Sequence, residues 1–202
     1  MFSVGDKIIY SENGVCTVEK IAPLETGGTQ NPRLYYHLSP LIGSGMFFVP
    51  VDSDAFMRPV MSRDEAEALI AAIPGIEPAI CNDSRFNHVD AYYRELFKLH
   101  SCETLVSIVK GIRLRLSGRK TRSSRAEATM RRAKDILHGE LAVALDLDLQ
   151  EVEGYVIRIW TLPYMDMTYA LFYDGLLAHE AGPDTAGFIP DGSQRNDDPW
   201  DR

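Results

Sequence analysis

The sequence predicts an α+β protein, in which a β-rich N-terminal part precedes an α-helical bundle. Residues 1–60 hold five short segments that are rich in β-branched or aromatic residues and are separated by turn signals. From Ser62 onward, apolar residues recur at helical spacing, and Gly or Pro marks the predicted helix ends. We therefore predict two domains, residues 1–60 and 61–158, followed by a partly disordered acidic tail, 159–202, which has two basic and eight acidic residues.

The predicted strands are short, which favours a small half-open β-barrel of Tudor or SH3 type. They cover residues 7–10, 15–21, 33–38, 46–51 and 56–58. The pair Asn13-Gly14 predicts a hairpin turn between the first two strands. In the third strand, Leu34, Tyr36 and Leu38 alternate with period two and are expected to share one face.

Pro50 indicates where in the sheet the fourth predicted strand lies. Because proline has no N–H to donate, this strand is expected at a sheet edge, unless Pro50 lies at a bulge or strand end. An open edge that carries Phe47, Phe48 and Val49 would favour aggregation. Two interpretations remain open on these residues: Pro50 protects the edge, or a partner protein adds a strand there.

Four or five helices are predicted after the strands. The first begins with the capping box Ser62-x-x-Glu65, and a second capping box, Ser124-x-x-Glu127, is expected to start the longest helix. The other helices are expected at about 87–100, 103–116 and 149–156. The apolar positions predict which faces are buried: Ala66, Leu69, Ile70 and Ile73 in the first helix, and Tyr92, Leu96 and Leu99 in the second.

Positive charge is concentrated in residues 110–134, which hold ten basic residues and one acid in a chain of net charge −8. Such a cluster is typical of a surface that binds a polyanion, DNA first. A solvated helix face is the alternative. Residues in a loop before a helix N-terminus are best placed to meet phosphate; here they are Arg119, Lys120, Arg122 and Arg125.

The sequence predicts no catalytic, metal or cofactor site. His37, His88, His100 and His138 lack the spacing of metal ligands, and residues 111–121 lack the spacing of a phosphate-binding loop. Cys16, Cys81 and Cys102 are far apart, without C-x-x-C spacing. With no N-terminal signal and no membrane-length apolar run, we expect a cytoplasmic protein with no membrane association.

Several motifs follow one another in a characteristic order. Four lie in the N-terminal part: Phe2-x-Val4-Gly5-Asp6-x-x-x-Tyr10-x-x-x-Gly14-Val15, Tyr35-Tyr36-x-Leu38, Phe48-Val49-Pro50-Val51 and Met57-Arg58-Pro59-Val60. Two lie in the helical part: Leu96-x-Lys98-Leu99-x-Ser101 and Ala133-Lys134-x-Ile136-Leu137-x-Gly139-Glu140-Leu141-Ala142. Over about residues 1–147, the chain resembles the CarD/CdnL family of RNA polymerase-binding transcription regulators, whose N-terminal domain is shared with transcription-repair coupling factor.

The resemblance implies a non-enzymatic regulator, expected to be a monomer, whose N-terminal domain binds the RNA polymerase β subunit by strand pairing. The residues expected to make this contact are Met46, Phe47, Phe48, Val49 and Pro50.

The resemblance also implies that the helical domain contacts promoter DNA at the upstream edge of the bubble. There a tryptophan of the family wedges into the minor groove and stabilises the open complex. His88 takes that tryptophan's position, while Asp90, Ala91 and Tyr93 replace the basic residues beside it. Arg85 and His88 complete the predicted DNA-binding set. The alternative function is a polymerase-binding interaction module that has lost DNA binding.

Overall fold

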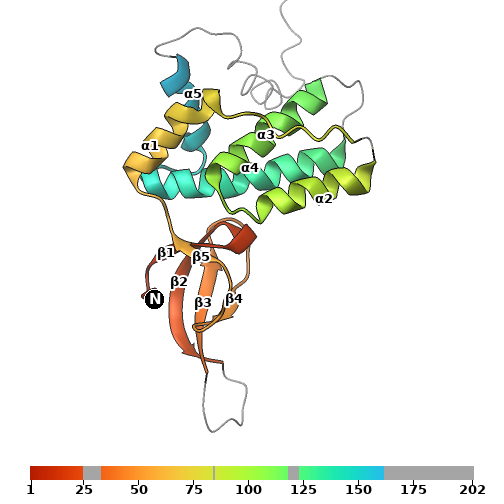
Figure 1. Cartoon of the computed structure of the whole chain (residues 1–202). Helices are drawn as coiled ribbons and strands as arrows, with labels where there is room; N and C mark the ends of the chain where they lie inside the picture. Colours follow the sequence, from red (N-terminus) through yellow and green to blue (C-terminus); the bar gives the residue numbers. More distant parts are fainter. Residues whose placement is uncertain (25–32, 84, 118–122, 162–202) are drawn as a thin grey trace, which may run out of the picture. The chain divides into compact units, whose positions relative to one another are not determined.

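The computed structural model describes residues 1–24, 33–83, 85–117 and 123–161 (Figure 1). They form a five-stranded antiparallel sheet followed in the chain by five α-helices, all within one compact unit, Met1–Met165. The predicted α+β class is thereby confirmed. Closure of the strands into a Tudor- or SH3-like barrel and assembly of the helices into a bundle stay predictions, as do the domain boundaries.

The sheet contains β1 (Lys7–Tyr10), β2 (Val15–Pro23), β3 (Leu34–Pro40), β4 (Phe47–Pro50) and β5 (Met57–Pro59). Their order in the sheet is β4-β3-β2-β1-β5. The predicted hairpin turn between β1 and β2 is confirmed. It consists of a 3-10 turn, Ser11–Asn13, followed by Gly14 at φ 73°, a backbone conformation that suits glycine.

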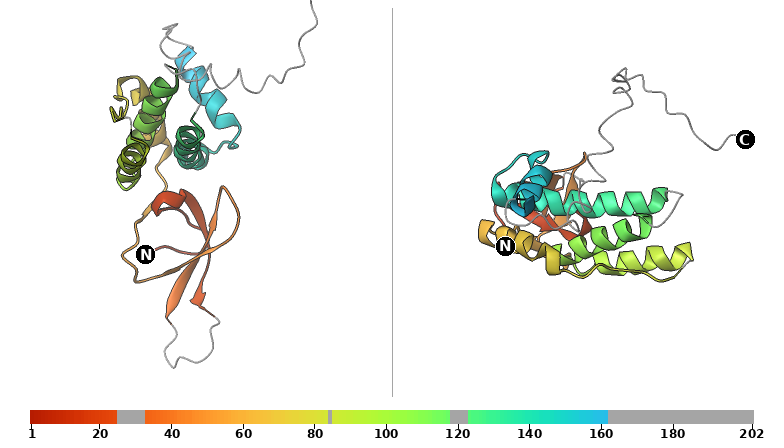
Figure 2. Two further views of the ribbon diagram at one scale, coloured as in Figure 1. Left: turned by 90° about the vertical axis from the view of Figure 1, so that its right-hand side faces the viewer. Right: turned by 90° about the horizontal axis from the view of Figure 1, so that it is seen from above.

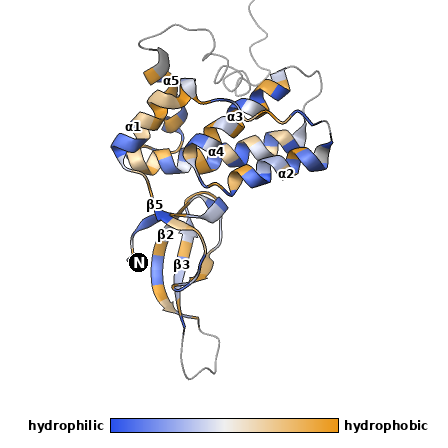
Figure 3. Cartoon of the chain, in the orientation of Figure 1, coloured by the Kyte–Doolittle hydropathy of each residue, from blue (hydrophilic) through white to orange (hydrophobic). Residues whose placement is uncertain are grey.

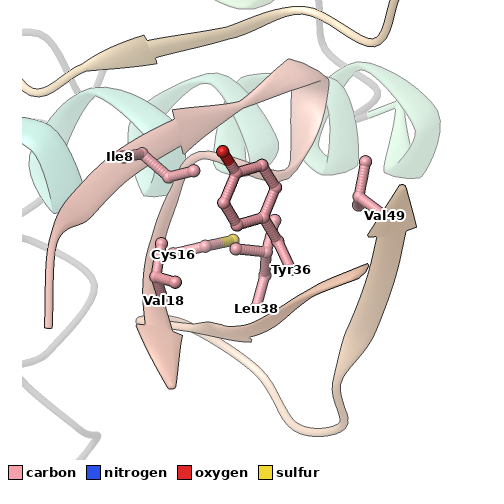
Figure 4. Close-up of a cluster of buried hydrophobic side chains, with 6 residues drawn as sticks. All are labelled: Ile8, Cys16, Val18, Tyr36, Leu38 and Val49. Carbon is pink, nitrogen blue, oxygen red and sulfur yellow. The ribbon is translucent and has the colours of Figure 1, made fainter. Parts of the chain in front are cut away.

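One face of the sheet forms an apolar core, in which the Tyr36 ring lies among aliphatic side chains and Cys16 (Figure 4). The period-two prediction is confirmed for Tyr36 and Leu38, which are buried, whereas Leu34, at the start of β3, is exposed. The Tyr36 hydroxyl accepts a hydrogen bond from the main-chain N–H of Phe2 at 3.1 Å. This satisfies the one polar atom of a buried ring.

The helices are α1 (Arg63–Ala72), α2 (Phe86–Phe97), α3 (Cys102–Ser117), α4 (Ser124–Leu145) and α5 (Glu151–Thr161). The first predicted capping box is confirmed, since Ser62 and Glu65 exchange hydrogen bonds between side chain and main chain. The second is wrong by one residue. Ser123 is the N-cap of α4, and its hydroxyl accepts from the N–H of Ala126.

The predicted buried face of α2 is also wrong by one position, which corresponds to about 100° around a helix. Tyr93 and Phe97 are buried, whereas Leu99 lies beyond the end of α2 and is exposed. The Tyr93 hydroxyl donates to the Ala79 carbonyl at 3.2 Å, so a polar partner is present for it inside the protein. Tyrosine with a satisfied hydroxyl can take a core position that an aliphatic pattern does not reveal.

Helix α4 is the organising element of the helical part. It contacts α1, α3 and α5 as well as β2, and α2, α3 and α4 lie side by side (Figure 2). Apolar and polar residues alternate around the helices, as expected for elements that bury one face (Figure 3). Within the described residues, no helix is both long and apolar enough to cross a membrane.

His138 of α4 should make stability depend on pH. Burial lowers the pKa of His138 from 6.5 to about 4, with a smaller contribution from Lys134. Below pH 6.5 the unfolded chain binds a proton that the folded protein does not, so the free energy of unfolding falls as the pH drops toward 4. We expect a loss of about 1–2 kcal/mol between about pH 7 and 5 in chemical denaturation. The His138→Gln variant should lose this part of the pH dependence; an unchanged profile would contradict the assignment.

Candidate functional site

Strand β4 is an edge of the described sheet, as Pro50 predicted, because it pairs only with β3 (Figure 1). Val51 N–H donates to the Leu34 carbonyl at 3.0 Å. In an antiparallel pair, successive residues direct their main-chain groups alternately toward and away from the partner strand. With Phe48 opposite His37 and no register shift, Val49 faces β3, whereas Phe48 and Pro50 direct their main-chain groups to the open edge.

This edge can accept only a short strand. Phe48 offers both an N–H and a C=O, but Pro50 offers a C=O alone. Pro50 can therefore protect the edge while a partner strand pairs there. A proline at an edge shortens the strand that can pair but does not prevent pairing at a neighbouring residue.

The side chains of the predicted edge residues divide into two groups. Phe48 is 49% exposed and Met46 43% exposed, and the Phe48 ring packs edge-on against His37 with a centroid distance of 4.9 Å. Val49 is buried, and the Phe47 ring packs against Tyr10 at 5.5 Å. The first group can contact a partner, while the second anchors β4 to the sheet.

Several bases of the stretch 110–134 bind the protein itself. Lys110 donates to the carbonyls of Ile73 and Pro74 at 3.0 and 3.2 Å, and burial lowers its pKa. Arg115 donates to the carbonyls of Cys81 and Asp83 at 2.9 and 3.1 Å. These two side chains hold the segment before α2 against α3, and they were not recognisable as structural from the sequence.

Two more bases of the stretch bind acids far away in the chain. Arg132 lies 2.6 Å from Glu12, across 120 positions, and its guanidinium stacks on Phe97. Lys134 pairs with Glu153 of α5 at 3.3 Å, and burial lowers the pKa of this lysine. The shortage of acids within the stretch therefore does not leave these charges unpaired.

The predicted DNA-contacting residues Arg85 and His88 share one partner, Asp83. Its carboxylate accepts from Arg85 Nη2 at 2.9 Å and from His88 Nδ1 at 2.8 Å. It also accepts from the main-chain N–H of Arg85 at 2.9 Å. These bonds, those of Arg85 first, hold the pKa of Asp83 well below its usual range. Asp83 therefore fixes Arg85 and His88 at the start of α2. The only sequence signal for this role was the position of Asp83 shortly before the predicted helix.

The structure brings three predicted residues, Arg85, His88 and Arg125, to one end of the helical part. Arg125, in the first turn of α4, lies 3.2 Å from Asp90 in the first turns of α2. The side chains of Arg85, His88 and Arg125 are 69%, 52% and 66% exposed. We call these three residues the basic end. Arg119, Lys120 and Arg122 lie outside the described residues.

Residues 2–61 match the family described as CarD-like/TRCF RID domain, a family of RNA polymerase-interacting domains. This segment belongs to that family. The RID segment contains all five strands, including the open edge of β4, so the N-terminal resemblance is confirmed. The helices lie outside the matched residues. A comparison with curated proteins found no match for the chain.

Two motif positions of the RID domain have a clear structural role. Gly5 adopts φ 91°, which L residues with a side chain rarely adopt. Arg58 of β5 reaches beyond the RID domain and forms an ion pair with Glu140 of α4. Glu140 is buried, and the sequence did not predict a role for it. The only sequence signal was that Glu140 belongs to the motif Ala133–Ala142, which resembles the last long helix of the CarD/CdnL family.

Proposed function

We propose that this protein is a non-enzymatic transcription regulator that binds the RNA polymerase β subunit through the edge of β4 and contacts promoter DNA through its helical part, stabilising the open complex. The observation that carries the proposal is an open, partly apolar strand edge inside an RNA polymerase-interacting domain. It is expected to act as a monomer.

Strand addition explains how this edge would bind. The main-chain groups of Phe48 supply hydrogen bonds that any extended partner segment can complete, while the Phe48 and Met46 side chains offer an apolar contact that selects among partners. His37 supports the Phe48 ring from the neighbouring strand. The polymerase segment is therefore expected to be an extended strand with an apolar side chain next to Phe48.

The Phe48→Asp substitution tests this proposal in the full chain. We expect polymerase affinity to fall by about 2 kcal/mol, or roughly 30-fold, because a carboxylate would lose water in an apolar contact. Biolayer interferometry with purified RNA polymerase would measure the loss. Leu114→Asp, at another exposed apolar residue, on α3, is the matched control and should leave affinity unchanged. Wild-type affinity in a folded Phe48→Asp protein would exclude this edge.

The DNA contact is supported by the basic end, which presents two arginines and a histidine together. The nearby carboxylates of Asp83 and Asp90 reduce the net charge there. His88 is also a smaller wedge than the tryptophan of the family. We therefore propose contact mainly with phosphates. The internal pairing of Arg132 and Lys134 favours the second candidate, a polymerase-binding module without DNA binding.

The salt dependence of binding to a forked promoter duplex separates these candidates. If the segment before α4 meets phosphate, replacing Arg119, Lys120 and Arg122 with Ala should flatten the log K versus log salt slope by about 0.9 per lost contact, roughly 2.7 in all. Replacing Lys7, Lys20 and Arg33 of the RID domain with Ala removes the same charge and should change the slope little. Equal slopes in wild type and both variants would exclude phosphate contact by this segment. A wild type that does not bind the duplex at low salt would favour the module without DNA binding.

A further inference from the structure

Glu140 occupies an unusual position for a carboxylate. Its side chain is 0% exposed, and it is the one buried charged residue in the described part of the chain. Both terminal guanidinium nitrogens of Arg58 donate to it, Nη1 to Oε1 and Nη2 to Oε2, the latter at 2.8 Å. The Met61 N–H donates at 3.0 Å and the Cys102 thiol at 3.0 Å. The carboxylate is thus surrounded by donors from other elements.

These donors come from separate parts of the fold. Arg58 lies in β5, Met61 in the connection between β5 and α1, and Cys102 at the start of α3. Glu140 lies on α4, 82 positions after Arg58. A buried carboxylate is tolerated only when its countercharge and donors are in place. The arrangement of the sheet and α4 that satisfies Glu140 is therefore strongly favoured over arrangements that separate them.

Apolar side chains also lie close to α4, since Val15, Leu41 and Ile42 are near Gly139, but the other polar contacts between the sheet and the helices are weaker. Arg132 and Glu12 form an ion pair whose side chains are partly solvated, and exposed pairs contribute little. Phe56 stacks on His100 at 4.1 Å, but both rings are only partly covered. Between β5 and α1 there are only the residues 60–62. Without Glu140, the sheet and the helices would share only this connection, the peripheral polar contacts and a small apolar contact with α4. Parts of a chain that are joined by a small interface are expected to reorient.

We propose that Glu140 is a positioning residue that fixes the RID sheet against α4, so that the β4 edge and the basic end are presented in one orientation. The proposed fixed orientation rests on the buried carboxylate and its donors; its use in joining polymerase to DNA rests on the proposed function.

Residual dipolar couplings of the full chain test this inference. In the wild type, one alignment tensor should fit the N–H couplings of both sheet and helices. In Glu140→Gln, which keeps the shape and an acceptor oxygen, the degree of order of the sheet should fall to about half that of the helices. Glu12→Gln, which removes only the peripheral ion pair, should still fit one tensor.

Arg58→Lys provides a milder second variant, because lysine keeps the charge but loses the two-pronged geometry. We expect the couplings of Arg58→Lys to require two alignment tensors, one for the sheet and one for the helices. This variant tests the proposal even if Glu140→Gln does not fold. One tensor for Arg58→Lys, or for a folded Glu140→Gln, would overturn the proposal, as would two tensors for the wild type. Polymerase affinity, measured separately, should be retained in both variants. Failure of the wild type to bind polymerase would refute the proposed function without affecting the tensor result.

Discussion

Phe48→Pro should remove most of the affinity for RNA polymerase and leave the RID sheet folded. The Phe48 N–H points away from β3, so its loss breaks no bond within the sheet. The substitution would leave a carbonyl of the bound polymerase strand without a hydrogen-bond donor, and it would also remove the exposed Phe48 ring. We expect a loss of about 2–3 kcal/mol, or roughly 30- to 150-fold in Kd, by the same interferometry.

Two neighbouring variants make this result interpretable. Phe48→Ala removes the ring but keeps the N–H, so it should cost clearly less affinity than Phe48→Pro. Val49→Pro removes an N–H that faces β3 and a core side chain, and it should unfold the strand. If Phe48→Pro and Phe48→Ala bind equally well, the partner does not pair with this edge.

Glu140→Ala should lower the free energy of unfolding by about 3–5 kcal/mol, because removing one partner of a buried ion pair leaves the other uncompensated. Arg58 and the Met61 N–H would lose their acceptor together. Urea unfolding at neutral pH measures the difference. Asp135→Ala, on the exposed side of the same helix, should change stability by less than about 0.5 kcal/mol.

A double substitution separates charge from packing. Arg58→Met combined with Glu140→Gln removes both charges and keeps an acceptor for Met61. It should be more stable than Glu140→Gln alone, since no isolated charge remains near the interface. A Glu140→Ala variant that loses less than about 1 kcal/mol would mean that water reaches this carboxylate in solution.

The sequence by itself determined features that depend on neighbouring residues. Alternation in 33–38 predicted β3, Pro50 predicted the edge position of β4, and the Ser62-x-x-Glu65 box predicted the start of α1. Each signal acts within a few residues, through main-chain hydrogen bonding and side-chain periodicity. For the same reason the family-like motifs of the RID domain could be recognised without a structure.

Only the tertiary structure decided which charges are available to a partner. The cluster of bases in residues 110–134 indicated a polyanion-binding surface, but Lys110 and Arg115 bind carbonyls before α2, and Arg132 and Lys134 bind remote acids. The burial of Glu140 likewise depends on β5, α3 and α4 meeting at one point. Composition cannot reveal such pairs, because they join residues many positions apart that only packing of the sheet and helices brings into contact.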